Sequence, residues 1–107
     1  MRRLLPASIV AACLLALAPA HAAGNVENGA QLAFTCAGCH GIAEYRNAYP
    51  NYRVPKIAGQ NEIYLANSLK AYRDGDRRHP TMAAQASSFS DQDIADLAAY
   101  FAAQGRP

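Results

Sequence analysis

The sequence predicts an all-α domain with three main helices and long loops. After residue 24, β-branched residues are scattered and nowhere alternate with polar ones, so no segment is typical of a strand. Apolar residues instead recur at helical spacing in three segments, each with a start or stop signal. The chain has 107 residues, which allows one domain at most.

Residues 1–23 are typical of a secretory signal peptide and not of a folded domain. Two arginines precede an apolar run from Leu4 to Ala18, and a small-residue cleavage signal follows at 20–22. The run is too short and too rich in alanine for a membrane anchor. We therefore expect export to the periplasm, with residues 24–107 as the mature domain.

Cys13 leaves a second interpretation of this leader open. The segment from Val10 to Cys13 resembles a bacterial lipobox, which would make Cys13 a lipid-anchored N-terminus. The apolar run continues past Cys13, however, whereas a lipobox normally ends such a run. A periplasmic domain is the prediction, and a lipid anchor at Cys13 is the alternative.

The charge of the mature part excludes a polybasic nucleic-acid-binding protein. The whole chain has 10 basic and 8 acidic residues, and removal of Arg2 and Arg3 leaves eight of each. Trp is absent, and alanine raises the hydrophobic fraction of 51%. A domain this small, with few large apolar side chains, usually needs a covalent staple or a cofactor.

The first predicted helix runs from about Val26 to Cys36. Val26, Ala30 and Ala33 share one face, with Gly29 beside them. Glycine inside a helix costs about 1 kcal/mol relative to alanine. We therefore expect Gly29 to permit a close helix crossing.

The second predicted helix runs from about Glu62 to Asp74. Leu65, Leu69 and Tyr72 fall at i, i+4 and i+7, which places them on one side of the helix. Gly75 follows as a stop signal.

The third predicted helix has the clearest pattern. Ser90 to Asp93 form a capping box with acidic residues in the first turn. Four apolar residues follow at i, i+3, i+4 and i+7: Ile94, Leu97, Ala98 and Phe101. Gly105 is expected to end the helix.

Two long loops separate these helices. One runs from Gly41 to Gly59 and contains Pro50 and Pro55, and the other runs from Gly75 to Phe89 and contains Pro80. Loops of this length are uncommon in a compact domain unless something else orders them.

Residues 36–40, Cys-Ala-Gly-Cys-His, form the C-x-x-C-H sequence that is typical of covalent c-type haem attachment. Two thiols three residues apart on a helical turn can reach the two vinyl groups on one porphyrin edge and form thioethers. His40 then projects under the ring centre as an iron ligand. Ala37 and Gly38 are small, so the chain can pass close to the ring edge.

Other interpretations of Cys36 and Cys39 are weaker. A thioredoxin-like redox pair belongs in a βαβ setting, which this sequence does not predict. A zinc site needs four ligands, and only His79 would remain to join Cys36, Cys39 and His40. A structural disulfide across so short a loop would stabilise little. The prediction is one covalently bound haem c with its iron.

A six-coordinate iron needs a second ligand, and the candidates are Met82 and His79. Met82 is the only methionine of residues 24–107, and we expect it in the second loop after Pro80, off any helical stripe. A thioether ligand stabilises ferrous iron and raises the reduction potential, whereas a second histidine would lower it. Met82 is the predicted distal ligand, His79 is the alternative, and a core-filling methionine is the non-functional interpretation.

Pro55 and Ile57 are the candidate residues around His40. An imidazole that binds a metal donates its other N–H to an acceptor, often a backbone carbonyl, and Pro55 can offer one from a fixed loop geometry. Ile57 would cover the ring face. Basic loop residues and the nearby tyrosines are candidate donors to the haem propionates, and the basic ones are Arg53, Lys56, Arg77 and Arg78.

These elements together resemble a class I c-type cytochrome, and are most similar to the small bacterial periplasmic mono-haem cytochromes and to one domain of the di-haem cytochromes. The resemblance covers nearly all of residues 24–104. It rests on an ordered set: Gly29, Cys36 to Gly41, Pro55 to Gln60, Tyr64 with Leu65, Leu69, Gly75, Met82, and Leu97 to Phe101. Residues 42–53, with tyrosines at 45, 49 and 52, depart from the pattern of the family.

The resemblance implies a cytochrome c fold whose helices and loops wrap around one covalent haem. It implies that Cys36 and Cys39 bind the haem, that His40 is the proximal ligand and that Met82 is the distal one. It also implies that the Pro55 carbonyl accepts a hydrogen bond from the His40 ring. Gly29 is expected at the crossing of the first and last helices, against Tyr100 or Phe101.

A haem with both axial positions filled leaves outer-sphere electron transfer as its function, so we expect an electron carrier with no catalytic residues. The expected donor is a quinol-oxidising complex or a dehydrogenase, and the expected acceptor is a terminal oxidase or reductase, each bound weakly. We expect no nucleic-acid partner, no membrane span, and a monomer or weak dimer. The alternatives are a haem sensor or peroxidase with an open distal site, and a haem subunit of a dehydrogenase complex.

The charges of the mature part are unevenly distributed along the chain. Residues 46–78 contain seven basic and three acidic residues, whereas the rest of residues 24–107 contains one basic and five acidic. Such a distribution would give a neutral protein a dipole that orients it toward partners, and the alternative is an ordinary scatter of charges without a role.

Overall fold

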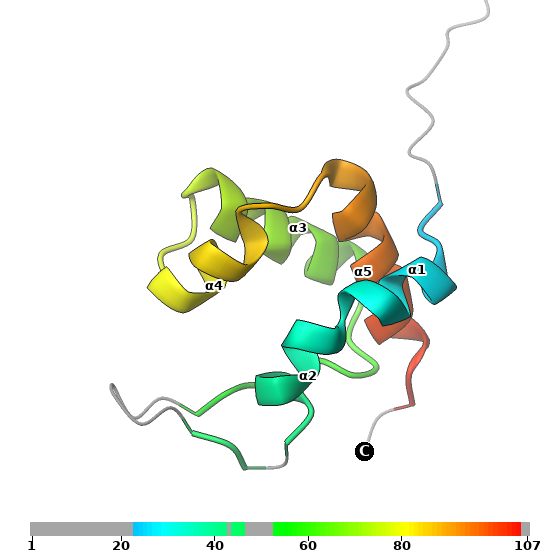
Figure 1. Ribbon diagram of the computed structural model, residues 1–107, viewed down its shortest axis with the longest axis horizontal. Coiled ribbons are helices and arrows are strands. Elements are labelled where there is room, and N and C mark those ends of the chain that lie inside the picture. The colour runs from blue at the N-terminus through cyan, green and yellow to red at the C-terminus, as the bar shows by residue number, and fades with distance from the viewer. Residues whose placement is uncertain (1–22, 43, 47–52, 106–107) are drawn as a thin grey trace, which may run out of the picture.

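The computed structural model describes residues 23–42, 44–46 and 53–105, and five helices make up its regular structure there (Figure 1). They are α1 (Val26–Leu32), α2 (Phe34–His40), α3 (Glu62–Asp74), α4 (Pro80–Ala86) and α5 (Asp91–Ala103). The β pairing in these ranges is an isolated antiparallel bridge between Arg46 and Arg53. The predicted all-α class is confirmed.

Residues 1–22 of the predicted leader, with Cys13, lie outside the described residues, as do Tyr49 and Tyr52 of the loop that departs from the family pattern. In the described ranges, no helix combines the length and the hydropathy that crossing a bilayer requires.

The first predicted helix extends beyond Cys36 to His40 and is divided at Ala33. The Ala33 N–H donates to the Gly29 carbonyl at 2.9 Å, and the Ala33 carbonyl accepts from the Ala37 N–H at 3.0 Å. Ala33 itself keeps helical backbone angles, with φ of −72° and ψ of −5°. The helical hydrogen bonds therefore pass through the boundary, and the C-x-x-C-H segment is itself helical.

Helix α1 crosses α5 at Gly29, which is buried. A Cβ atom at this position would lie 2.1 Å from the Asp96 carbonyl oxygen and 2.8 Å from the Tyr100 Cβ, so a side chain does not fit. The glycine thus allows the two backbones to approach, and the expected contact with Tyr100 is present.

Helix α3 has the bounds that its sequence pattern predicts. The Asn61 side chain accepts a hydrogen bond from the Tyr64 N–H at 2.9 Å and begins the helix. Gly75 ends it in the left-handed conformation, with φ of 87°, which glycine adopts without strain.

Helix α5 begins with the predicted capping box. The Asp93 N–H donates to Ser90 Oγ at 3.1 Å, and the Ser90 N–H donates to Asp93 Oδ2 at 2.9 Å. The helix ends at Ala103, before Gly105, because Gln104 is already extended.

The loop predicted from Gly75 to Phe89 contains a helix, α4, that the sequence pattern did not indicate. Pro80 is its first residue, where the missing N–H costs nothing, and the Nδ1 atom of His79 accepts a hydrogen bond from the Met82 N–H at 3.3 Å. The expectation that Met82 lies in a loop is therefore wrong. It failed because α4 is short and its alanines form no recognisable apolar stripe.

The core is built around α5. Ile94 and Leu97 are fully buried, and Leu97 packs with Leu65 of α3, Ala33 and Phe101. Helix α5 packs between α1 and α3, α4 packs on α3, and α2 contacts α1 (Figure 1). Among the described residues, α2 and α4 thus lie at opposite ends of this series of contacts and do not pack against each other.

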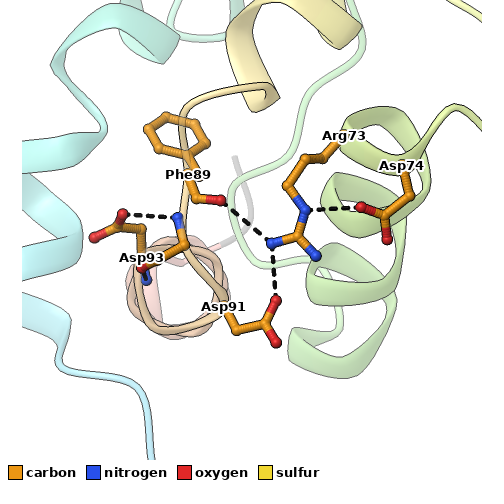
Figure 2. A network of polar contacts seen from close by, with 6 residues as sticks. Arg73, Asp74, Phe89, Asp91 and Asp93 are labelled. Atoms are coloured by element: carbon orange, nitrogen blue, oxygen red, sulfur yellow. Dashed lines mark hydrogen bonds and ion pairs between the residues drawn. The ribbon is translucent and has the colours of Figure 1, made fainter.

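Arg73 connects the end of α3 to the start of α5 (Figure 2). Its Nε donates to Asp74 Oδ1 at 2.9 Å, and its Nη1 donates to Asp91 Oδ1 at 2.8 Å and to the Phe89 carbonyl at 3.2 Å. The hydrogen bonds to Asp74 and then to Asp91 raise the pKa of the Arg73 guanidinium above its ordinary value. The segment between α4 and α5 is therefore held against α3.

Candidate functional site

A cavity of about 530 Å³ has α2 and α4 on its walls and α3 and α5 at its base. This volume is within the range of small-molecule and cofactor sites. Its base is apolar and is formed by five residues of α3 and α5: Leu65, Leu69, Leu97, Ala98 and Phe101. The stripe that Leu65 and Leu69 form on α3 thus faces the cavity as well as the core.

His40 lines the cavity from the last turn of α2. Its Nδ1 lies 2.7 Å from the Pro55 carbonyl oxygen, so the hydrogen bond that the resemblance implies is present. Because a carbonyl oxygen only accepts, Nδ1 must carry the proton, and Nε2 keeps a lone pair that is available to a metal ion. The loop around Pro55 therefore fixes both the orientation and the tautomer of the ring.

Cys36 and Cys39 line the same cavity, one helical turn apart on α2. Both are free thiols and partly buried. Burial raises the pKa of the Cys36 thiol above its ordinary value. The unmodified chain therefore holds two adjacent thiols next to the imidazole of His40.

Met82 lines the cavity from α4 and is partly buried. The hydrogen bond from its N–H to the His79 ring anchors the first turn of this helix. The His79 ring also lies edge-on to the Tyr72 ring, with the centroids 6.3 Å apart. His79 therefore supports the helix that presents Met82, and it too borders the cavity.

The structure assigns the predicted loop residues to different places. Ile57 and Pro55 line the cavity, as do Arg53 and Arg77, whereas Arg78 is exposed and does not. Arg53 is paired with Glu44 at 2.6 Å. Sequence reasoning gave no site role to four polar residues on the cavity wall: Gln60, Ser68, Thr81 and Gln85. Ser68 could have been found from the sequence, because it lies one helical turn after Tyr64 and directly before Leu69, and both of these belong to the set on which the resemblance rests.

These residues fit a c-type haem. Two helical thiols, an imidazole with a free nitrogen and a thioether border one cavity that has an apolar base and a cationic edge. A zinc site would require His79 to join Cys36, Cys39 and His40, and within the described residues no three His, Cys, Asp or Glu side chains are grouped to hold a metal ion. The fold and site define the class of helical proteins that enclose a covalent haem.

Comparison with known proteins agrees with this class. The Cytochrome c family model matches residues 26–104. Cytochrome c4 of Pseudomonas aeruginosa is 45% identical over 85 residues, which are 79% of this chain and 41% of that protein. Cytochrome c-554(548) of Halomonas halodenitrificans is 41% identical over 85 residues, covering 77% of this chain and 99% of that protein.

A third relative has a functional name. The thiosulfate dehydrogenase electron acceptor of Thiomonas intermedia is 33% identical over 101 residues, which are 94% of this chain and 43% of that protein. The chain therefore spans less than half the length of this relative and of cytochrome c4, but nearly all of cytochrome c-554(548).

The chain belongs to the cytochrome c family. Its fold is the all-α cytochrome c fold, and its cofactor is haem c, an iron porphyrin that the family binds covalently. The predicted family, fold and cofactor are confirmed.

Proposed function

We propose that this chain is a periplasmic electron carrier that transfers single electrons through one His/Met-ligated haem c. The observation that carries the proposal is the shared cavity, which the thiols and imidazole of α2 border together with the thioether of α4. In this proposal Cys36 and Cys39 form the thioether bonds, His40 Nε2 is the proximal iron ligand and Met82 Sδ is the distal ligand.

Each ligand is supported by a contact that limits its movement. The 2.7 Å hydrogen bond to Pro55 holds the His40 ring, and the cap at His79 holds the helix turn of Met82. When bound, haem supplies an iron that alternates between the ferrous and ferric states. Ligands that are held by the fold keep nearly the same geometry in both states, which lowers the barrier to electron transfer, and the apolar base of the cavity excludes water.

Ligation of the iron by both His40 and Met82 would favour a carrier over an enzyme. If His40 and Met82 both bind the iron, no position remains for a substrate, oxygen or peroxide. The alternatives are therefore a sensor or peroxidase whose Met82 is not bound, and a haem subunit held within a dehydrogenase. The sensor or peroxidase does not use the support that His79 gives to Met82. A haem subunit would use it, and it is distinguished from a free carrier by migrating with a larger complex and not as a monomer.

We further propose that the partners are redox proteins. One relative is named an electron acceptor of thiosulfate dehydrogenase, which supports a dehydrogenase as donor, with a quinol-oxidising complex as the other possibility. The acceptor would be a terminal oxidase or reductase. Residues 1–23 would direct export, and residues 24–107 would form the carrier domain.

Four measurements on the exported protein test the proposal. The intact mass should exceed that of the processed polypeptide by one haem, and ferric absorption should show the weak red band of thioether-bound haem. A potentiometric titration should show one reversible one-electron step. An unmodified mass would contradict haem attachment, and carbon monoxide binding to the untreated ferrous protein would contradict a filled distal site.

Substitution of the two candidate distal ligands separates them. Met82→Ala should abolish the red band and allow carbon monoxide to bind, because it removes the thioether. His79→Asn is the matched control, since asparagine is also a favoured helix cap but carries no imidazole. If His79 were the distal ligand instead, the wild-type protein would lack the red band, and carbon monoxide would bind to ferrous His79→Asn but not to ferrous Met82→Ala.

A further inference from the structure

Three cationic side chains line the cavity, and they differ in their partners. Arg53 is paired with Glu44, and Lys56 follows Pro55 on the side of His40. Arg77 lies in the segment between α3 and α4. Among the described residues it makes no ion pair with a carboxylate. Its charge therefore borders the cavity without a balancing anion from this part of the chain.

Arg77 is nevertheless held in place by several contacts. Its backbone N–H donates to the Ala71 carbonyl at 3.1 Å, and its guanidinium lies 4.7 Å from the centre of the Tyr72 ring. Its Nη1 donates to Ser68 Oγ at 3.3 Å. These contacts orient the guanidinium before any ligand binds.

Tyr64 completes a polar cluster on this wall. Hydrogen bonds with Arg77 and Ser68 lower the pKa of the Tyr64 phenol. Tyr64 and Ser68 lie one turn apart on α3, and both line the cavity beside Arg77. The Tyr64 side chain is 51% exposed and Arg77 is exposed, so the cluster lies at the cavity mouth.

A haem brings two propionate carboxylates into such a cavity. Ionised carboxylates are costly to bury, so they are expected at the mouth, where water and hydrogen-bond donors can reach them. A guanidinium matches a carboxylate with two parallel N–H groups, and a charge-assisted bond of this kind is about twice as strong as a neutral one. The cluster offers the cation and the hydroxyl donors that this ligand needs.

We propose that Arg77, together with Tyr64 and Ser68, binds one propionate carboxylate of the haem. This inference rests on the proposed function, because it requires haem in the cavity. Arg77 then has two effects. It positions the cofactor, and its positive charge favours the ferrous state, so that it raises the reduction potential.

Arg77→Met in the intact holoprotein tests the site, with Arg78→Met as the matched control. Both variants lose one positive charge at neighbouring exposed positions, but Arg78 does not line the cavity. The readout is the reduction potential from acid to alkaline pH, together with the propionate-bending band in the resonance Raman spectrum.

Arg77→Met should lower the potential at neutral pH. It should also raise the pKa of the propionate, because the substitution removes an adjacent cation that favours the ionised carboxylate. The rise of the potential on acidification then begins at a higher pH, and the Raman band shifts. Arg78→Met should leave the pH profile and the band unchanged. Identical profiles in the two variants, or an unchanged profile in Arg77→Met, would overturn the proposal.

Two milder variants keep the test decisive if Arg77→Met fails to mature. Arg77→Lys keeps the charge and should retain most of the wild-type profile, whereas Tyr64→Phe should change it in the same direction as Arg77→Met, by less. Unchanged profiles in Tyr64→Phe, with an unchanged Raman band, would also count against the site. If instead the intact mass of the wild-type protein showed no bound haem, that result would refute the proposed function itself.

Discussion

Asp96 shows how one side chain connects the start of the domain to its last helix. This carboxylate is buried, and it accepts hydrogen bonds from the Asn25 N–H at 2.7 Å, Asn28 Nδ2 at 2.6 Å and Gln92 Nε2 at 2.8 Å. The Asn25, Asn28 and Gln92 donors, in that order, lower the pKa of Asp96 below its usual value. A buried carboxylate is tolerated here because its lone pairs are satisfied.

We predict that Asp96→Asn destabilises the holoprotein at neutral pH and not in acid. Because the pKa of Asp96 is lower in the folded than in the unfolded state, its contribution is full above the unfolded pKa of about 4 and is lost as the pH falls through the folded value. Thermal unfolding from pH 7 to pH 3 should show a difference from wild type that narrows in acid. Glu27→Gln, on the exposed part of α1, is the control. A difference that stays constant with pH would contradict the prediction.

At the scale of elements, the support of α4 by His79 determines how firmly Met82 is presented. The helix has seven residues, too few to be stable in isolation, and it begins with the His79 cap followed by Pro80. Its contacts are to α3, so the cap and this packing together hold the proposed distal ligand.

Loss of this cap should weaken the distal ligand without removing it. His79→Ala should cost about 1 kcal/mol of helix stability, and His79→Asn should cost little. The population with Met82 displaced should therefore rise roughly fivefold in His79→Ala, which is what about 1 kcal/mol implies. The apparent affinity of the ferric protein for added imidazole measures this population. Equal affinities in the alanine and asparagine variants would show that the cap does not control the ligand.

Elements with strong local signals could be predicted from the sequence, and those that depend on tertiary contacts could not. Helices α3 and α5 have an apolar stripe and a terminal signal, and their starts agree with the structure. Helix α4 lacks such a stripe and is stabilised by its cap and by packing on α3, so Met82 was expected in a loop. The sequence predicted a helix only as far as about Cys36, whereas α2 continues to His40. The apolar pattern of the first predicted helix does not extend past Cys36.

The same distinction applies to the site. C-x-x-C-H is contiguous, so its chemistry can be predicted from the sequence. The need of a metal-bound imidazole for a carbonyl acceptor made Pro55 a candidate partner of His40, and the family resemblance implied the same pair. The cluster of Tyr64, Ser68 and Arg77 joins a helix to the segment that follows it. Only the folded arrangement shows that Arg77 borders the cavity and that its neighbour Arg78 does not.

At the scale of the whole molecule, the uneven charge distribution predicts salt-dependent electron exchange. Positive charge is concentrated in residues 46–78, and the first turn of α5 carries Asp91 and Asp93. A dipole orients the protein as it approaches a charged partner, and salt screens this effect within a Debye length of about 10 Å at 0.1 M. The rate of electron exchange with a charged redox protein should change steeply between low and high ionic strength. A flat profile would exclude steering.

The separation of α2 from α4 links cofactor attachment to the survival of the folded chain. In the described part of the chain these two helices border one cavity but do not pack on each other. A porphyrin ligated from both helices would therefore connect them. A cofactor that binds the native state but not the unfolded state stabilises the native state. A polypeptide that failed to acquire its prosthetic group would keep an open apolar cavity, with α4 held only by its cap and its packing on α3, and proteolysis is expected to begin there.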